Sequence, residues 1–366
     1  MAEPSTPADM IARLRLIRSE NIGPVTYFQL LARFGSAQAA IDAIPDLAAR
    51  GGGRAPRLVP KSQIEREMEQ VERLAAQYLF LGLPPYPPLL AELETAPPAL
   101  IVRGHLSLLE RPAVALVGAR NASAAACRYA RQLAQALGAG GTAIVSGLAR
   151  GIDAAAHDGS IDSGTIAVIA GGIDIFYPPE NEARQRAIAE RGLLIAEQAP
   201  GVEPRARHFP YRNRIIAGLA LGTVVIEAAP RSGSLITARC AAEFGREVMA
   251  VPGSPLDPRA QGCNQLIRDG ATLIQSAEDV LEAIEPGQIR PFRQPGRHYS
   301  PPDLSAHADE RHRQLVLGLL SVTSVPIDEL IRQSDLPAPI VQTVLLELEL
   351  AGRLERHAGG KVSLAA

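Results

Sequence analysis

The middle of the chain alternates short apolar runs with amphipathic stretches. Each apolar run ends in small residues, as at Ala113–Val117 and Ile166–Ile169, and a segment with helical spacing follows. This alternation is typical of an open, doubly wound α/β sheet with mostly parallel strands. We therefore predict one such domain from residue 83 to residue 285.

Residues Asp9–Ala48 have helical periodicity instead, with breaks at Asn21–Pro24 and Gly35–Ser36, so we predict a small domain of short helices over residues 1–82. The Ile-Gly-Pro turn at the first break resembles the turn of helix-hairpin-helix DNA modules. Pro24 lacks the N–H group that such a turn offers to a phosphate. We therefore favour a structural helical domain over one that contacts DNA.

Residues 286–308 are rich in proline, arginine and glycine and predict a linker, and residues 309–366 resemble a winged helix. Its third helix, Ala338–Ala351, offers Gln342 and Thr343 but also Glu347 and Glu349, and no basic residue occurs before Arg353. A helix that reads duplex DNA should present arginine, lysine, asparagine or glutamine to the groove. The pattern disfavours a transcription regulator and favours a protein-contact or autoregulatory tail.

Composition narrows the possible functions. The formal net charge of -2 excludes a globally basic nucleic-acid binder, so a polyanion site must be a local patch. No apolar run of about 18 residues predicts a membrane span, and the polar start predicts no signal peptide, so we expect a cytoplasmic protein. The three cysteines are far apart in the sequence, and we expect neither disulfides nor a metal or other cofactor.

Glycine- and serine-rich turns follow the apolar runs, at the edge where parallel strands end and helices begin. Helix N-termini there expose free N–H groups and bind anions. One or two such turns suffice for a mononucleotide, so a whole row predicts a ligand with several phosphates. The first turn, Gly118–Ser123, lacks the G-x-G-x-x-G pattern of dinucleotide sites, and Arg120 stands where it can clamp a phosphate.

Asp153 and His157 lie four residues apart, like an acid–base or metal pair. No further ligands follow at fitting spacing, so we expect Asp153 to accept hydrogen bonds from its turn or helix end and His157 to pack against it.

Aromatic and basic residues predict contacts with single strands. Tyr177 follows a glycine turn and is placed to stack on a base or to close the core. The segment from Arg205 to Arg214 interleaves arginines with Phe209 and Tyr211. Charges that follow the backbone and rings that meet the bases are what single-stranded nucleic acid requires.

A competing hypothesis is a nucleotide-cleaving enzyme. Glu227 follows an apolar run and precedes the turn Pro230–Leu235, which resembles the phosphate-binding turn of Rossmann-like phosphoribohydrolases. A carboxylate beside such a turn is the arrangement a nucleotide hydrolase uses. No partner acid, nucleophile or metal set accompanies it, so this hypothesis ranks second.

Ordered blocks between Tyr86 and Ile284 resemble the DNA-processing protein A family, also called DprA or Smf, of bacterial transformation proteins. The blocks are Val117–Arg120, Ser146–Asp153, Ala170–Asp174 with Tyr177-Pro178, Phe209–Ile216, Ser232–Leu235 with Thr237-Ala238, and Val251–Gly253 with Gly262–Asn264. The resemblance implies an extended Rossmann fold between a SAM-like helical domain and a winged helix. It also implies a homodimer without enzyme activity that binds single-stranded DNA and loads RecA recombinase during natural transformation.

Under this resemblance, the expected DNA-binding residues are Gly118, Arg120, Ser123, Ser146, Gly147, Arg150, Gly171, Gly172, Tyr177, Asn181, Arg212, Asn213, Arg214, Ser232, Gly233 and Ser234. The expected dimer surface, an apolar and strand-like run, contains Leu266, Ile267, Leu273 and Ile274. Many relatives have a basic residue where this chain has Pro179 and Glu180. Arg184, one turn later, is the expected replacement for that phosphate contact.

Overall fold

A computed structural model describes residues 6–285, 308–357 and 359–365. The chain divides into two compact units, one formed by Glu67–Phe292 and the other by Met1–Arg66 together with Arg293–Ala366. The predicted linker at 286–308 lies, except for residue 308, outside the described residues.

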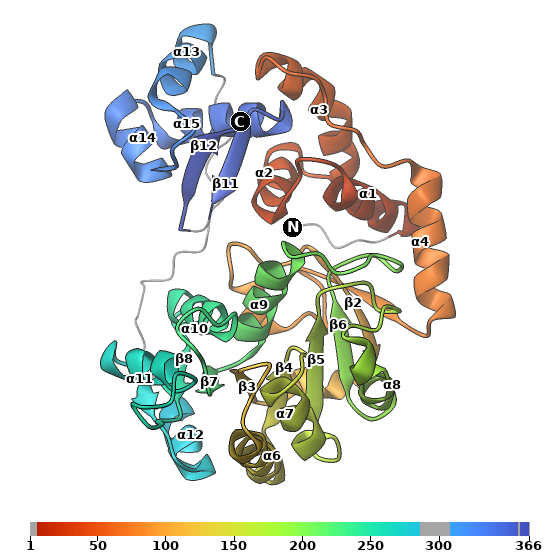
Figure 1. The fold of residues 1–366 in the computed structure, drawn as a ribbon. Helices are drawn as coiled ribbons and strands as arrows, with labels where there is room; N and C mark the ends of the chain where they lie inside the picture. The colour runs from red at the N-terminus through yellow and green to blue at the C-terminus, as the bar shows by residue number, and fades with distance from the viewer. Residues whose placement is uncertain (1–5, 286–307, 358, 366) are drawn as a thin grey trace. The chain divides into compact units, whose positions relative to one another are not determined.

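The larger unit contains a nine-stranded sheet with the order β1-β2-β6-β5-β4-β3-β7-β8-β9 (Figure 1). The pairs from β6 to β9 are all parallel, whereas β2 is antiparallel to both β1 and β6. The strands are β1 (Gln77–Phe80), β2 (Ala99–Gly104), β3 (Ala113–Gly118), β4 (Ala143–Ser146), β5 (Thr165–Ile169), β6 (Leu193–Ala196), β7 (Gly222–Ile226), β8 (Glu247–Ala250) and β9 (Thr272–Leu273). The predicted doubly wound, mostly parallel sheet is confirmed.

Helices cover both faces of this sheet, which explains why its strands are apolar throughout. Alternate residues of β3 show the division: Ala115 packs toward one group of helices and Leu116 toward the other. The first group is α5 (Pro88–Ala91), α9 (His208–Leu219), α10 (Ser234–Glu243) and α11 (Gln261–Arg268). The second is α4 (Lys61–Arg73), α6 (Ala124–Ala139), α7 (Ile152–Ser160), α8 (Glu182–Arg191) and α12 (Ala277–Ile284).

The sheet begins earlier than the predicted boundary between residues 82 and 83. Strand β1 pairs with β2 along its whole length, from Gln77 opposite Val102 to Phe80 opposite Ala99. This strand has only four residues, and three residues separate it from the end of α4, so its apolar run is short for a sequence pattern to reveal.

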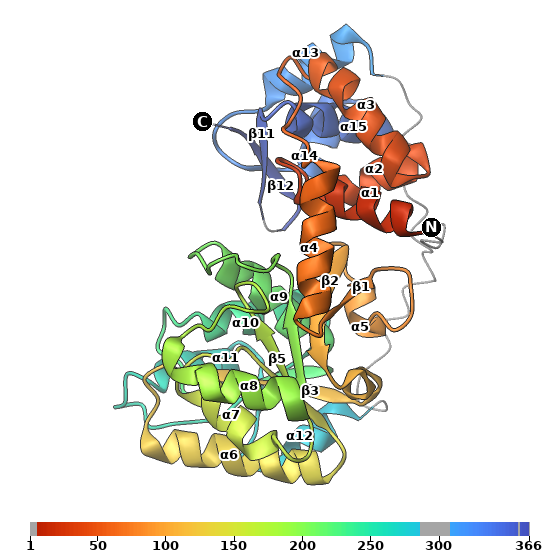
Figure 2. The same ribbon diagram turned by 90° about the vertical axis from the view of Figure 1, so that its right-hand side faces the viewer.

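The smaller unit combines the helical front of the chain with its tail. Three helices form the front: α1 (Pro7–Arg18), α2 (Pro24–Phe34) and α3 (Ala37–Arg50). The tail is a winged helix with α13 (Glu310–Leu319), β10 (Val325–Pro326), α14 (Ile327–Ser334), α15 (Ala338–Leu350), β11 (Leu354–His357) and β12 (Lys361–Leu364). Its strands form an antiparallel sheet in the order β10-β12-β11. Both predicted terminal folds are confirmed (Figure 2).

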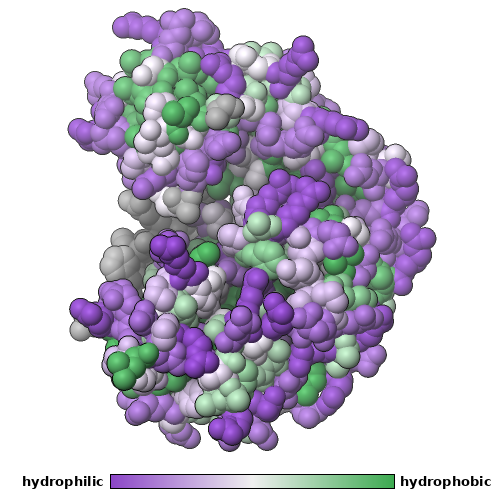
Figure 3. All heavy atoms as spheres, in the orientation of Figure 1, coloured by the Kyte–Doolittle hydropathy of each residue, from purple (hydrophilic) through white to green (hydrophobic). Residues whose placement is uncertain are grey.

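The face drawn in Figure 3 is mostly hydrophilic, with an apolar area over the winged-helix domain. Leu315 on α13 is 43% exposed and Val322, in the loop that follows, is 73% exposed. Among the described helices, none is both long enough and apolar enough to cross a bilayer.

Candidate nucleic-acid interface

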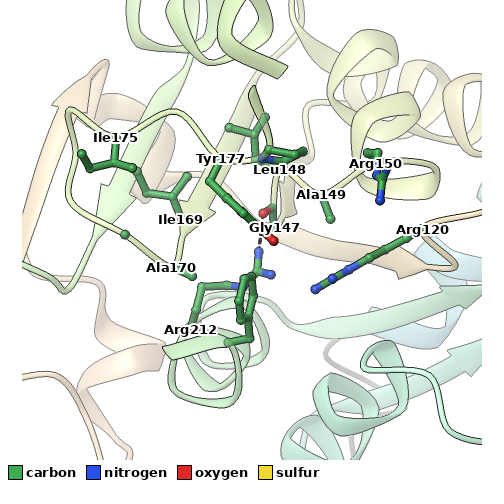
Figure 4. Close-up of a pocket in the computed structure, with 13 residues that line it drawn as sticks. Arg120, Gly147, Leu148, Ala149, Arg150, Ile169, Ala170, Ile175, Tyr177 and Arg212 are labelled. Carbon is green, nitrogen blue, oxygen red and sulfur yellow. Dashed lines mark hydrogen bonds between the residues drawn. The ribbon is translucent and has the colours of Figure 1, made fainter. Parts of the chain in front are cut away.

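A cavity of about 40 Å³ lies at the carboxyl ends of β3, β4 and β5, where the first turns of α9 face the loops that follow these strands (Figure 4). Pockets that enclose a whole small molecule measure roughly 300–1,000 Å³, so this cavity suits a single small group. Six of the predicted DNA-binding residues line it: Arg120, Gly147, Arg150, Gly171, Tyr177 and Arg212.

Two guanidinium groups converge on this cavity (Figure 4). Arg120 is exposed and forms no ion pair with any described residue, and Arg212 approaches from α9, buried to 6% exposure. Both lie against the ring of Phe209, with their Cζ atoms 5.2 and 5.9 Å from its centroid. Two cations that line one cavity favour an anion there.

Arg212 is built into the protein. Its Nη1 donates hydrogen bonds to the carbonyl oxygens of Gly147 and Val168, at the ends of β4 and β5. A side chain at Gly147 would overlap this guanidinium, which is why glycine is needed there. Burial lowers the pKa of Arg212 to about 10, Asp153 raises it and Arg120 lowers it further, so Arg212 remains a cation at neutral pH.

An aromatic surface adjoins the two cations. Tyr177 is 45% exposed, and its ring centroid lies 5.7 Å from that of Phe209. Of the two roles open to Tyr177, this exposure fits a ring that can stack on a base better than one that closes the core. Phe209 belongs to the basic segment but is not among the predicted site residues. Its place three residues before Arg212 is the available signal, because both Arg120 and Arg212 lie over its ring.

The turn after β4 has a strained backbone that its neighbours hold in place. Leu148 has φ +56°, a left-handed conformation that non-glycine residues rarely adopt. Asn181 Nδ2 donates to the Leu148 carbonyl at 2.8 Å, and the Ala149 N–H donates to Asp153 Oδ2 at 3.3 Å. The expectation that Asp153 accepts from its turn is confirmed. Asn181 is 4% exposed and supports this turn, so its own amide does not offer a DNA contact.

His157 contacts a different partner from the one predicted. Its Nδ1 lies 2.7 Å from Thr165 Oγ1 on β5, and the residue is fully buried. No partner is present for Nε2 among the described residues. Burial is the main cause that lowers the pKa of His157 to about 3, and the charge of Arg184 lowers it further. His157 is therefore a neutral core residue.

The crevice between β3 and β7, where the order of strands reverses, is closed by the chain itself. The Ala119 N–H donates to the Glu227 carbonyl at 2.7 Å. Ser123 donates to both carboxylate oxygens of Glu227, through its N–H at 2.8 Å and its hydroxyl at 2.5 Å. Doubly wound enzymes bind nucleotides in this crevice. Because Glu227 is occupied in bracing the start of α6, the structure does not favour the nucleotide-cleaving hypothesis.

Several predicted contact residues serve the fold instead. Arg214 turns away from the cavity and forms a largely buried ion pair with Glu197 at 2.5 Å. Its Nη1 also donates to the Thr95 carbonyl. The hydroxyl of Ser146 donates to the Leu116 carbonyl at 2.6 Å inside the sheet. Residue type and position in the sequence predict contacts for Arg214 and Ser146, and only their packing shows that they face inward.

The remaining predicted glycines and the loop before α10 also lie outside the cavity lining. Side chains at Gly118 and Gly172 would overlap the carbonyl oxygens of Ile226, at the end of β7, and Ala199, so both glycines serve close backbone packing. Asn213 Nδ2 donates to the Gly233 carbonyl at 3.2 Å, which ties α9 to that loop. The hydroxyls of Ser232 and Ser234 lie 2.7 Å apart and bond to each other.

Two further arginines near the cavity have acidic partners. Arg150 lies 3.4 Å from Glu180, and both side chains are about half exposed. Such exposed pairs contribute about 0–1 kcal/mol, so Arg150 remains available to a phosphate. Arg184, the expected replacement for a missing basic residue, forms two hydrogen bonds to Asp158 at 2.7 and 3.0 Å. It does not line the cavity.

The expected dimer surface is only partly a surface. Leu266 and Ile267 belong to α11 and pack partly into the core, so the run is not the strand that its apolar residues suggested. Leu273, on the two-residue strand β9, is 46% exposed, whereas Ile274 is fully buried. Of these four residues, Leu273 is the most accessible to a partner.

Three family models match the chain. Residues 77–285 match DNA recombination-mediator protein A, residues 7–69 match the DprA-like N-terminal HHH domain, and residues 300–360 match the DprA winged helix domain.

Individual proteins and solved structures similar to this chain carry the same family names as these models. The DNA processing protein DprA of Streptococcus pneumoniae is 48% identical over 202 residues, 55% of this chain and 71% of that protein. Protein Smf of Escherichia coli is 37% identical over 311 residues, 83% and 82% of the two chains. The X-ray structure of S. pneumoniae DprA matches with TM-score 0.64 and 36% identity over 76% of this chain and 98% of that one. A structure describing the single-stranded DNA binding mode of DNA processing protein A from Helicobacter pylori matches with TM-score 0.52 and 28% identity. The match covers 56% of this chain and 94% of that one.

His157 makes stability depend on pH. Because its pKa is about 3 when folded and near 6.5 when unfolded, the stability it contributes is complete above pH 6.5 and is lost as the pH falls toward 3. We expect it to account for a loss of about 2 kcal/mol in the free energy of unfolding between pH 7 and pH 5. Denaturant titrations at both pH values should show a smaller loss for His157→Asn. Equal losses in both proteins would contradict the assignment.

Proposed function

The chain belongs to the DNA-processing protein A family, also called DprA or Smf, and from this premise we propose that it binds single-stranded DNA at the edge where β3, β4 and β5 end. The observation that carries the proposal is the convergence of Arg120 and Arg212 on one small cavity beside the rings of Tyr177 and Phe209. Two guanidinium groups that line one cavity can both donate hydrogen bonds to one phosphate. The exposed ring of Tyr177 offers a stacking surface for a neighbouring base.

The chemistry of this edge favours single strands over duplex. Bases in a duplex are stacked on one another and cannot lie on a protein ring, whereas an unpaired base can. The cavity meets the phosphate backbone with arginine and glycine turns, and phosphate contacts carry no sequence information. We therefore propose binding without base preference and without cleavage of the strand.

The wider role follows from the family. We propose that the chain protects incoming DNA in the cytoplasm and loads RecA recombinase onto it during natural transformation, acting as a homodimer. The reported single-stranded DNA binding mode of the H. pylori relative supports the first step of this proposal. The RecA step rests on the family resemblance alone.

Removing the exposed guanidinium tests the phosphate site. We expect Arg120→Ala to weaken binding to oligothymidine by about 1.5–3 kcal/mol, the usual contribution of a hydrogen bond to a charged group. The slope of log affinity against log salt should become shallower by about 0.7, because one phosphate contact is lost. Fluorescence anisotropy over a salt series measures both effects.

Arg191→Ala is the matched control for this experiment. Arg191 ends α8 at the amino end of β6, the opposite edge of the sheet, and removing it makes the same charge change. Equal losses in the two variants would show that net charge, and not the cavity, determines binding. Arg212→Ala is less informative, because Arg212 also ties together the ends of β4 and β5.

The stacking surface is tested at Tyr177. We expect Tyr177→Ala to weaken the binding of single strands by about 1–3 kcal/mol. The loss should be similar for oligothymidine and oligocytidine, because stacking tolerates any base. Tyr211→Ala is the control: Tyr211 is 53% exposed on the same helix as Arg212, but its ring lies against Arg214 and does not line the cavity. If both tyrosine variants bound like the unaltered protein, stacking on Tyr177 would be ruled out.

Light scattering tests the dimer. Strand β9 is the last strand of its sheet, and such an edge has unpaired backbone groups that a second copy can bind. We expect Leu273→Asp to shift the protein toward monomer at micromolar concentration. Leu256→Asp, on a side chain that is 94% exposed in a loop, should leave the molar mass unchanged. An unaltered mass for Leu273→Asp would argue against this surface.

A further inference from the structure

The third helix of the winged helix, α15, is apolar on two faces that pack against different partners. One face belongs to the core of the winged-helix domain itself, through Val341, Val344, Leu345 and Leu348. The other contributes Leu346 and Leu350, one helical turn apart, to the core of α1, α2 and α3. A helix that is apolar on all sides must be covered on all sides, and here the front of the chain supplies the second cover.

Polar contacts join the same two partners. Gln29 Nε2 on α2 donates to Gln342 Oε1 at 3.1 Å, and Arg353 Nη1 donates to the Gly51 carbonyl at 3.1 Å. Figure 2 shows α15 beside α3, and contacts between these two helices confirm the arrangement. The contact therefore joins segments about 300 residues apart in the sequence.

The charged and amide side chains on α15, and the first arginine after it, already have partners within the chain. Glu347 and Glu349 form ion pairs with Arg313 and Arg356, at 2.8 and 2.7 Å. Gln342 bonds to the N-terminal helices, as described above. Arg353, the first basic residue after the helix begins, is directed to the Gly51 carbonyl. A reading helix must instead project such groups freely into the major groove.

We propose that α15 is a protein-docking helix whose partner is the N-terminal helical domain of the same chain. The two ends of the chain then act as one module, and the winged helix does not read duplex DNA through its third helix. This role is independent of single-stranded DNA binding at the cavity of the larger unit.

Gly51 allows a sharp test of this docking. Its φ of −71° suits any residue, but a Cβ atom there would overlap the carbonyl oxygen of Glu347 on α15. Gly51→Ala therefore disturbs the contact from the side of the N-terminal domain and leaves the winged-helix core untouched. Leu346→Asp disturbs it from the other side. Gly23→Ala is the matched control, because no atom lies within 4 Å of a Cβ atom at that position.

The experiment uses the full chain with a protease site introduced between residues 286 and 307. After cleavage, gel filtration at micromolar concentration should keep the tail bound to the remainder in the unaltered protein and in Gly23→Ala. We expect Gly51→Ala and Leu346→Asp to raise the dissociation constant of the tail at least tenfold. The proposal would be overturned if the tail separated from the rest of the unaltered protein. It would also be overturned if the dissociation constant of the tail in both Gly51→Ala and Leu346→Asp stayed within twofold of that in the unaltered protein.

Duplex binding supplies a second readout on the uncleaved variants. We expect Gly51→Ala and Leu346→Asp to bind a labelled duplex no more tightly than the unaltered protein does. A tenfold gain in duplex affinity in these variants would show that the N-terminal helices mask a DNA-reading surface on α15. That result would overturn the docking role. Affinity for oligothymidine, measured on the same samples, reports separately on the cavity, and the proposed single-stranded DNA function predicts that it stays unchanged.

Discussion

The buried guanidinium of Arg212 is the interaction around which the binding edge is organised. It reaches from α9 to the carbonyl oxygens at the ends of β4 and β5, and so joins a covering helix to two strands of the sheet. This requires glycine at position 147, since any side chain would occupy the space of the guanidinium. Burying a cation has a high cost unless it is hydrogen-bonded. Two backbone carbonyls at fixed strand ends accept from Nη1 of Arg212, whereas its Nε has no partner among the described residues.

The position of the cavity follows from how the chain closes the adjacent crevice. In doubly wound folds the ligand usually binds where the strand order reverses, which here is between β3 and β7. Glu227 and Ser123 fill that point, and their hydrogen bonds fix the start of α6. The accessible turns are displaced toward β4 and β5, and Arg120 and Arg212 meet there.

The smaller unit obeys a different constraint, which is the need to cover both apolar faces of α15. The winged-helix core covers one face, and the N-terminal helices cover the other. The acidic residues of this helix find arginine partners on neighbouring segments of the tail. The charged and the apolar side chains of this helix therefore both contact other parts of the protein. The winged-helix fold alone would have suggested that the helix binds DNA.

Local patterns in the sequence were sufficient for the fold class, the glycine turns and the exposed residues that follow them. Apolar runs that end in small residues predict buried parallel strands, and Arg120 and Tyr177, which follow such runs, do line the cavity. The family resemblance rests on the same local blocks.

Only the tertiary structure decided which polar side chains face outward. Arg212 and Arg214 lie two residues apart on one helix, yet one lines the cavity and the other is paired with Glu197. Ser123 and Asn181 likewise support turns and do not project from them. The physical reason is that a buried polar group forms hydrogen bonds with the groups that the packing brings near it. For these residues, the partners lie between about 20 and 100 residues away in the sequence. Such pairings leave no periodic trace in a single sequence.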